Sequence, residues 1–332
     1  MRKLIGGLAV GGVMMLTLGG GARAGQQPER TASPASTAVP PLWAYPVAQA
    51  AQPGTPPAPP PADDGSPKRL PGTAVTLTLK QVRDFANVPD WHPDDHPPMP
   101  EPVAHGRPKE MRACGFCHLV NGFGRPENAS LAGLPAAYIV QQMADFKNGD
   151  RKTSEPKMGP PNAMIQDAKA AHDDEIKAAA AYFASVPYKK WIRVVEARVV
   201  PKSKISGSMH VPTNDGNEPL GQRIIEMPEN LERTELRDAS SSFVAYVPVG
   251  SIKKGEALAK SASCGTCHGA DLMGSGPVPG IAGRSPSYLV RQLYDIKTGK
   301  RGGNIAPMQG VVSALELEDM IAIAAYVASQ EP

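Results

Sequence analysis

The stretch Cys114-Gly115-Phe116-Cys117-His118 has a second copy later in the chain, Cys264-Gly265-Thr266-Cys267-His268. Both copies follow the pattern Cys-X-X-Cys-His. Together they contain all 4 cysteines of the 332-residue chain. If both copies bind a group through sulfur, no thiol remains for a disulfide, a nucleophile or a further sulfur ligand.

This pentapeptide is the attachment signature of c-type haem. Two cysteines on one short turn can form thioethers to two edges of a porphyrin, and the adjacent histidine then lies under the iron. The sequence therefore predicts two covalently attached haem c groups. The residues predicted to bind the cofactor are Cys114, Cys117, His118, Cys264, Cys267 and His268.

Two other uses of paired cysteines fit less well. A zinc site could use both Cys-X-X-Cys pairs, but each pair is followed by histidine and the two pairs are 150 residues apart. A thioredoxin-like redox pair needs a surrounding βαβ pattern, which neither copy has.

The N-terminus has the form of a secretory leader, predicted over residues 1–24. Arg2 and Lys3 precede an apolar stretch, and Ala22-Arg23-Ala24 is a small-X-small cleavage site. We expect export to a bacterial periplasm; a retained N-terminal anchor is the alternative. Cleavage would remove three basic residues and bring the net charge of +3 to zero, so no nucleic-acid partner is expected.

The remaining chain divides by composition. Proline and alanine dominate the segment after the leader, which lacks the periodicity needed to fold and is predicted to be a semi-extended arm. The predicted divisions are the arm at 25–75, a first haem domain at 76–188, a connector at 189–249 and a second haem domain at 250–332.

The two haem segments align without a gap at an offset of 150 residues, which marks two copies of one domain. The fold class is therefore predicted to be mostly α, with two helical domains, each around one haem. Beyond the motifs, matched pairs include Gly124 and Gly274, Tyr138 and Tyr288, Gln142 and Gln292, Asp145 and Asp295, Gly149 and Gly299, and Arg151 and Arg301.

Helix limits can be predicted within the copies. Pro135 is typical of a helix start and Gly149 of a helix end. A last helix follows in each copy, and Asp173 or Asp174 is expected to cap the first of these. A short helix capped by Thr78 is predicted to extend to Ala86.

The connector is different in character. Its β-prone runs predict an ordered segment that contains strands. The runs are Trp191-Ile192-Arg193-Val194-Val195, Arg223-Ile224-Ile225 and Phe243-Val244-Ala245-Tyr246-Val247.

Each iron would also need a ligand opposite its histidine. In the second copy Met308 is the candidate, in a predicted Gly/Pro loop 40 residues after His268. In the first copy Met158 has the same spacing from His118. Met164 has the same spacing from the last helix, because Tyr182 and Tyr326 follow Met164 and Met308 by 18 residues each. We favour Met164, so the predicted metal ligands are His118, Met164, His268 and Met308.

The other histidines are weaker candidates for metal ligands. His92 and His96 lie near Asp94 and Asp95, but nothing else completes a metal-ligand set, and a polar loop is the simpler interpretation. His105, His172 and His210 do not occupy the loop that matches Met308, so none is favoured as a distal ligand.

A haem-ligating histidine usually donates its second N–H to a carbonyl, which orients the ring. In the second copy the stretch Gly276-Pro277-Val278-Pro279 is expected to present that carbonyl. In the first copy Ala129 replaces Pro279 and Arg125-Pro126 is displaced, so we expect the two haems to differ in reduction potential.

Both halves resemble class I cytochrome c, and the tandem resembles the bacterial di-haem cytochromes of the c4 type. The resemblance covers roughly residues 111–186 and 251–329, and rests on the attachment motif, the Tyr-X-X-X-Gln helix and the later methionine. It implies an electron carrier with no catalytic residues, acting between an exported dehydrogenase and a terminal oxidase or soluble carrier. Lys253, Lys254 and Lys260 are either a docking face for an acidic partner or a solvated helix face.

Two alternatives remain. A di-haem peroxidase would need one iron without a firm sixth ligand. A cytochrome subunit of a larger, membrane-associated oxidoreductase complex would account for the arm and the connector, which a soluble carrier does not need. A thiosulfate-oxidising cytochrome with a cysteine on its iron is disfavoured because there is no fifth cysteine.

Overall fold

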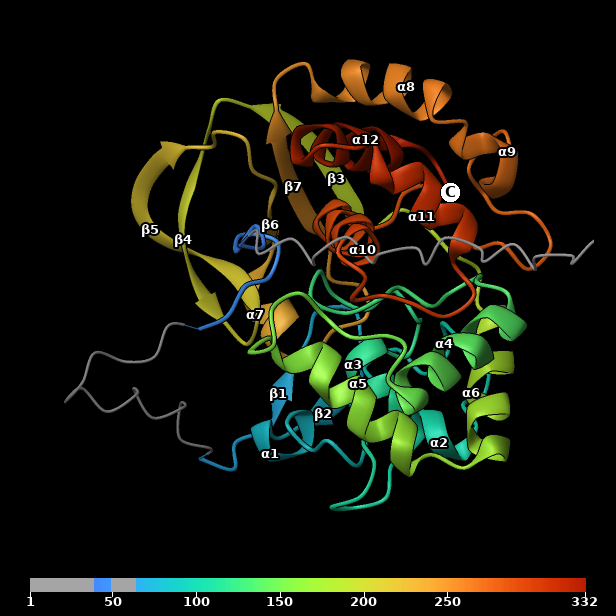
Figure 1. The fold of residues 1–332 in the computed structure, drawn as a ribbon. Helices are drawn as coiled ribbons and strands as arrows, with labels where there is room; N and C mark the ends of the chain where they lie inside the picture. The colour runs from blue at the N-terminus through green and yellow to red at the C-terminus, as the bar shows by residue number, and fades with distance from the viewer. Residues whose placement is uncertain (1–38, 49–63) are drawn as a thin grey trace, which may run out of the picture. The chain divides into compact units, whose positions relative to one another are not determined.

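The structure, a computed structural model, describes residues 39–48 and 64–332 (Figure 1). These residues belong to one compact unit, 36–332. The predicted leader and most of the predicted arm lie outside the described residues. Within the described ranges, every helix is too short or too polar to cross a lipid bilayer.

The first motif-bearing half is helical, as predicted. The helix α4 begins directly after Pro135 and ends at Gly149, whose φ of 79° gives the left-handed conformation that favours glycine at a helix end. The helices are α2 (Glu101–Ala104), α3 (Cys114–His118), α4 (Ala136–Asn148), α5 (Gly159–Ala170) and α6 (Asp173–Ser185).

The second half repeats this order of helices. A helix before the motif, α8, packs on the last helix, α12, and Gly255 lets the two backbones approach closely. The helices are α8 (Ser251–Ser261), α9 (Cys264–His268), α10 (Pro286–Lys297), α11 (Ala306–Ser313) and α12 (Leu317–Ser329).

Two details of the predicted helices change. Thr78 caps a helix as expected, but that helix, α1 (Leu79–Val82), ends four residues before Ala86. The prediction that Asp173 or Asp174 caps α6 is wrong. The N-cap is His172, and its backbone N–H is accepted by the Glu175 carboxylate at 2.7 Å, so both aspartates lie inside the first turn.

The connector contains two small sheets (Figure 1). Two predicted strands are confirmed as β3 (Ile192–Ala197) and β7 (Phe243–Pro248). The third strand, β6 (Ile225–Pro228), shares only Ile225 with the predicted run Arg223-Ile224-Ile225. In this sheet β7 is central, parallel to β3 and antiparallel to β6. The helix α7 (Leu231–Glu235) lies between β6 and β7 in the chain.

A hairpin in the connector was not predicted. The strands β4 (Val199–Ser206) and β5 (Met209–Pro219) pair antiparallel across Gly207 and Ser208, which both have positive φ. Lysine, proline, asparagine and glycine interrupt this stretch, so it has no continuous β-prone run. A short antiparallel pair, β1 (Lys68–Arg69) and β2 (Thr76–Leu77), precedes α1.

The prediction of a semi-extended arm is wrong for residues 39–48. Ala44 and Tyr45 are completely buried. The Tyr45 hydroxyl donates to the Asp295 carboxylate at 2.7 Å, and Arg291 donates to the Ala44 carbonyl at 2.8 Å. The aromatic residues of this segment therefore fold against α10 despite the prolines around them.

Candidate haem sites

The two motifs form short helices, α3 and α9, and the histidine that ends each helix is buried. Nδ1 of His118 lies 2.8 Å from the Ala129 carbonyl, and Nδ1 of His268 lies 2.7 Å from the Pro279 carbonyl. The predicted carbonyl in 276–279 is confirmed as that of Pro279. The first copy makes the same hydrogen bond although Ala129 replaces Pro279, because a backbone carbonyl accepts it whichever side chain is attached. The expected difference in reduction potential stays a prediction.

This hydrogen bond prepares each histidine to bind a metal. With Nδ1 donating to a carbonyl, Nε2 is left as the lone-pair nitrogen. Burial lowers the pKa of both His118 and His268, which favours the neutral imidazole that ligates metals.

Both motifs line the same cavity, whose volume is about 910 Å³. This is near the upper end of the range of about 300–1,000 Å³ found for small-molecule and cofactor sites. Its walls include all four cysteines, both motif histidines and apolar side chains from both halves. Among the last are Leu131, Ile139, Phe146, Phe183, Ile281, Leu289, Leu293 and Ile323.

The three candidate methionines differ in position. Met164 on α5 and Met308 on α11 line the cavity. Met158 is not among its lining residues and is completely buried in the hydrophobic cluster that includes Tyr45 and Ile224, against which Met308 also packs. The prediction of a loop around Met308 is wrong, because Pro307 lies in the first turn of α11, where proline is well tolerated.

The other predicted histidines lie elsewhere. None of them is among the residues that line the cavity. His92 contacts Asp238, His96 contacts Asp90, and His210 contacts Ser203 and the Trp43 carbonyl. In the described ranges no group of three or more histidine, cysteine or acidic side chains is arranged to hold a metal ion.

A polar cluster joins the two halves beside the cavity. Arg151 donates to Gln142 of its own half at 2.7 Å. It also donates to Gln292 at 2.8 Å and to the Tyr288 hydroxyl at 2.9 Å, both in the other half.

Arg301 makes the reciprocal contacts. It donates to Gln292 of its own half at 2.9 Å, and across to Gln142 at 3.0 Å and the Tyr138 hydroxyl at 2.8 Å. The only sequence signal for this cluster is that these tyrosines, glutamines and arginines all match at the repeat offset. No interface role was predicted from it.

The cluster also offers a test of fit for haem. Arg151 and Arg301 are buried lining residues. The buried Nε atoms of Arg301 and Arg125 have no hydrogen-bond acceptor among the described residues. A porphyrin with acidic substituents would supply such acceptors, while the apolar walls would suit its ring. The residues present therefore fit haem.

Two residues of the connector, Gly207 and Arg237, also line the cavity. Nη1 of Arg237 donates to the Phe116 carbonyl at 2.8 Å, and its guanidinium carbon lies 3.5 Å from the centroid of the Phe116 ring. Arg237 has a φ of 56°, an uncommon value for a residue other than glycine. Nothing in the sequence predicted that a residue 121 positions away would contact the first motif.

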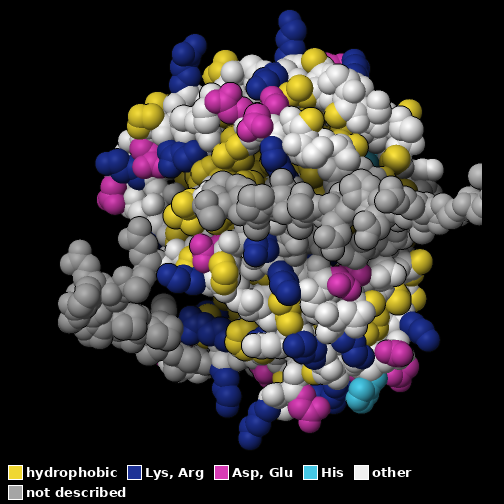
Figure 2. All heavy atoms as spheres, viewed as in Figure 1, with side chains coloured by type: hydrophobic (Ala, Val, Ile, Leu, Met, Phe, Trp, Pro, Cys, Tyr) yellow, Lys and Arg dark blue, Asp and Glu magenta, His cyan; other side chains and the backbone are white. Residues whose placement is uncertain are grey.

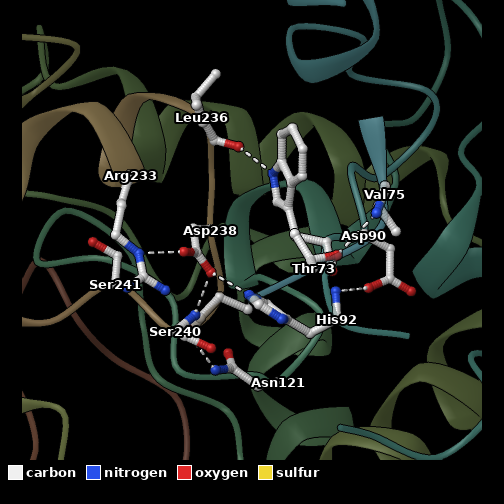
Figure 3. A network of polar contacts seen from close by, with 12 residues as sticks. Thr73, Val75, Asp90, His92, Asn121, Arg233, Leu236, Asp238, Ser240 and Ser241 are labelled. Carbon is white, nitrogen blue, oxygen red and sulfur yellow. Dashed lines mark hydrogen bonds and ion pairs between the residues drawn. The ribbon is translucent and has the colours of Figure 1, made fainter. Parts of the chain in front are cut away.

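Figure 3 shows how the neighbours of Arg237 are held. The Trp91 indole donates to the Leu236 carbonyl at 2.7 Å. The Asp238 carboxylate contacts His92 at 3.0 Å and Arg233 at 2.6 Å. Because the residues on both sides are fixed, the backbone can retain its strained conformation at Arg237.

The cytochrome c family model matches residues 252–331. Cytochrome c4 of Pseudomonas aeruginosa is 46% identical over 76 residues, which are 22% of this chain and 36% of that protein. Cytochrome c-554(548) of Halomonas halodenitrificans is 40% identical over 74 residues, or 22% of this chain and 89% of that protein. The chain spans 36–39% of the length of the three cytochromes c4 that it matches.

A longer match is weaker. The thiosulfate dehydrogenase electron acceptor of Thiomonas intermedia is 27% identical over 228 residues, which are 67% of this chain and 81% of that protein. The crystal structure of cytochrome c4 from Pseudomonas stutzeri has a TM-score of 0.43 and 21% identity, and covers 65% of this chain and 93% of that chain. The Halomonas relative is matched over 89% of its length at 40% identity, and the segment matched by the family model contains α9 and His268. The chain therefore belongs to the class I c-type cytochromes, among those related to cytochrome c4.

Proposed function

We propose that this chain is a di-haem cytochrome that transfers electrons between redox proteins and turns over no substrate itself. The observation that carries the proposal is the duplicated geometry. Each half has a motif helix, a buried histidine whose Nδ1 contacts a carbonyl, and a methionine on the wall of the shared cavity.

The residues have distinct tasks in this proposal. Cys114 and Cys117 hold the first haem by thioether bonds, and Cys264 and Cys267 hold the second. His118 with Met164 would hold the first iron, and His268 with Met308 would hold the second. When bound, haem would supply the one-electron redox chemistry. Ligands fixed in an apolar site would mean that little has to move when the charge changes.

The cavity supports electron exchange within the chain. Because side chains of both motifs line one cavity, the two haems would be neighbours. The contacts of Arg151 and Arg301 with both halves would keep their relative position constant.

For partners, we propose an exported dehydrogenase as donor and an oxidase or soluble carrier as acceptor, in the periplasm. The names of relatives support this: thiosulfate dehydrogenase electron acceptor, and the cytochrome subunit of sulfide dehydrogenase from Chlorobaculum tepidum. The name of the latter, with the docked segment 39–48, also favours a second candidate, a subunit of a larger oxidoreductase complex. Co-purification without cross-linker would separate the two.

The lysines of α8 give little support to a basic docking face. Lys254 pairs with Asp319 at 3.0 Å and Lys260 with Glu256 at 2.6 Å. Figure 2 shows basic side chains interspersed with acidic ones over the face that it draws. We therefore favour the interpretation of a solvated helix face.

The proposal is tested on protein produced with its haem attached. Intact mass should show two covalent haems, and both should carry the near-infrared Met–iron charge-transfer band. Met164→Ala should remove the band of the first haem, and Met158→Ala should leave it. An unmodified mass, or loss of the first band in Met158→Ala alone, would contradict the assignment. Rapid azide binding with peroxide turnover would favour the peroxidase alternative.

A further inference from the structure

One buried arginine of the second half connects equivalent points of the two halves. Nε of Arg284 donates to the Gly280 carbonyl at 2.7 Å, and Nη1 donates to the Ser130 carbonyl at 2.9 Å. Gly280 follows Ser130 by the repeat offset of 150. A single guanidinium group therefore bridges the same backbone carbonyl of both halves.

The residue directly before each of these two acceptors contacts a motif histidine. Nδ1 of His118 lies 2.8 Å from the Ala129 carbonyl, and Nδ1 of His268 lies 2.7 Å from the Pro279 carbonyl. Consecutive peptide units are planar and share a Cα atom, so a side chain that holds one carbonyl limits the rotation of the carbonyl before it. The positions of both histidine acceptors therefore depend on Arg284.

The surroundings of Arg284 hold its guanidinium group in this place. Nη2 donates to the Ala132 carbonyl at 3.0 Å, and the guanidinium carbon lies 4.2 Å from the centroid of the Tyr188 ring. The Tyr188 hydroxyl donates in turn to the Gly283 carbonyl at 2.9 Å. All three guanidinium nitrogens thus have acceptors, and Arg284 is only 7% exposed.

The partners of Arg284 are unusual for a buried cation. Within the described ranges its hydrogen-bond acceptors are backbone carbonyls, and no carboxylate forms an ion pair with it. A buried cation is costly, and an apolar residue of similar volume is often at least as stable. The equivalent residue of the first half is indeed apolar, Leu134. One arginine is sufficient because it reaches the carbonyls of both halves.

We propose that Arg284 is a positioning residue for both motif histidines, because it fixes the backbone at Ala129 and at Pro279. The inference deepens the proposed function and rests on it, since it requires His118 and His268 to ligate haem iron. A carbonyl that holds the second N–H of a ligating imidazole fixes the orientation of its ring. A change at Arg284 should therefore act on the histidine of the first half as well as on that of its own half.

The test observes the two imidazole N–H groups directly. Full-length protein with haem attached is labelled with 15N-histidine and reduced, and hydrogen exchange at Nδ1 of His118 and His268 is followed by NMR. In Arg284→Leu we expect both protons to exchange about tenfold faster, because each acceptor segment loses a supporting hydrogen bond. Unchanged exchange at His118, or a change at His268 alone, would overturn the proposed bridge.

Arg284→Lys separates the charge from the bridging geometry. Lysine keeps a cation, which an acidic substituent of haem would accept equally well, but its single ammonium group lacks the planar fork that spans two carbonyls. We expect exchange to stay fast at one histidine at least. If Arg284→Lys exchanges as slowly as the unmodified protein at both histidines, charge alone is responsible and the inference is wrong.

Tyr45→Phe is the control for general destabilisation. It removes a buried hydrogen bond to Asp295 on α10, away from both carbonyl segments. Exchange at both imidazoles should stay within about twofold of that in the unmodified protein. Acceleration equal to that in Arg284→Leu would show that global stability sets the exchange, which contradicts the inference. Fewer than two haems by intact mass in the unmodified protein would instead show that the proposed function fails.

Discussion

Arg151 and Arg301 lie opposite each other as an isolated antiparallel bridge, although they are equivalent positions of the internal repeat. Each arginine donates to the glutamine of its own half and to the glutamine of the other half. Neither half alone can satisfy both guanidinium groups. Equivalent residues of the repeat therefore form an interface with approximate twofold symmetry. This interface fixes how the two halves meet.

Removal of one shared acceptor should weaken this interface. Gln142→Ala takes an acceptor from both arginines and leaves buried donors without partners, which we expect to cost about 1–3 kcal/mol in the free energy of unfolding. Urea denaturation, monitored by circular dichroism, measures this free energy. Gln292→Ala should behave alike, and the double variant should deviate from additivity. Gln309→Ala, at an exposed site on α11, is the control. Additive effects would show that the arginines are not coupled.

The approach of α8 to α12 should depend on Gly255. A Cβ at this position would overlap the Ala322 carbonyl, so Gly255→Ala must separate two backbones, and we expect it to destabilise the fold by about 1–3 kcal/mol. Gly310→Ala is the matched control, because no heavy atom lies within 4 Å of a Cβ there. In a helix that change should stabilise by about 0.5–1 kcal/mol. The two thermal midpoints should move in opposite directions.

The docking of residues 39–48 should depend on the Tyr45 hydroxyl. Tyr45→Phe leaves the buried Asp295 carboxylate with one donor fewer, which should lower the free energy of unfolding by about 1–3 kcal/mol. Leu42→Ala, in the same segment but 56% exposed, should change it by less than about 0.5 kcal/mol. Limited proteolysis would report release of the segment. Equal sensitivity of the two variants would indicate that the hydroxyl contributes nothing.

Glu226 should make stability depend on pH. Burial raises the pKa of this carboxyl above its ordinary value of 4.5, against the hydrogen bonds from Ser285 and Ser287. The folded state then binds the proton more tightly than the unfolded state. The stabilisation is greatest below the unfolded value and is lost as pH rises through the folded pKa.

Glu226→Gln keeps an acceptor for Ser287 but removes the titration. Its stability relative to the unmodified protein should therefore increase as the pH rises above the ordinary value of 4.5, as measured by urea midpoints. Glu229→Gln, at a half-exposed carboxylate paired with Arg193, is the control. A parallel pH dependence of Glu226→Gln and the unmodified protein would contradict this assignment.

Local patterns accounted for much of the fold. Pro135 and Gly149 marked the limits of α4, and three β-prone runs marked the sheet of the connector. The motif spacing predicted His118 and His268 as ligands, and repeat alignment favoured Met164 over Met158; these assignments stay predictions. These features depend on neighbours in the sequence or on the repeat itself. The limits of the haem domains, 76–188 and 250–332, stay a prediction.

What could not be predicted depends on contacts between distant residues. Arg237 acquires its place beside Phe116 because Trp91 and His92 hold its loop, and no local pattern links these segments. The segment around Tyr45 docks because Asp295, 250 positions later, accepts a hydrogen bond from the Tyr45 hydroxyl. These contacts form only in the folded chain. The sequence alone contains both residues of each contact but does not show that they lie close together.

The strands β3 and β7 begin side by side, because they pair in parallel. Despite its length, the connector therefore carries the chain only one strand length beyond the point where it entered β3. Ile192 is opposite Phe243, and Ala197 is opposite Pro248, so the residues between them form a closed excursion. A slip of one residue in this register would displace one half against the other by about 3.3 Å. The register of this strand pair thus sets the spacing between the two halves. A substitution in this pair would change the spacing of the two motif helices without touching either.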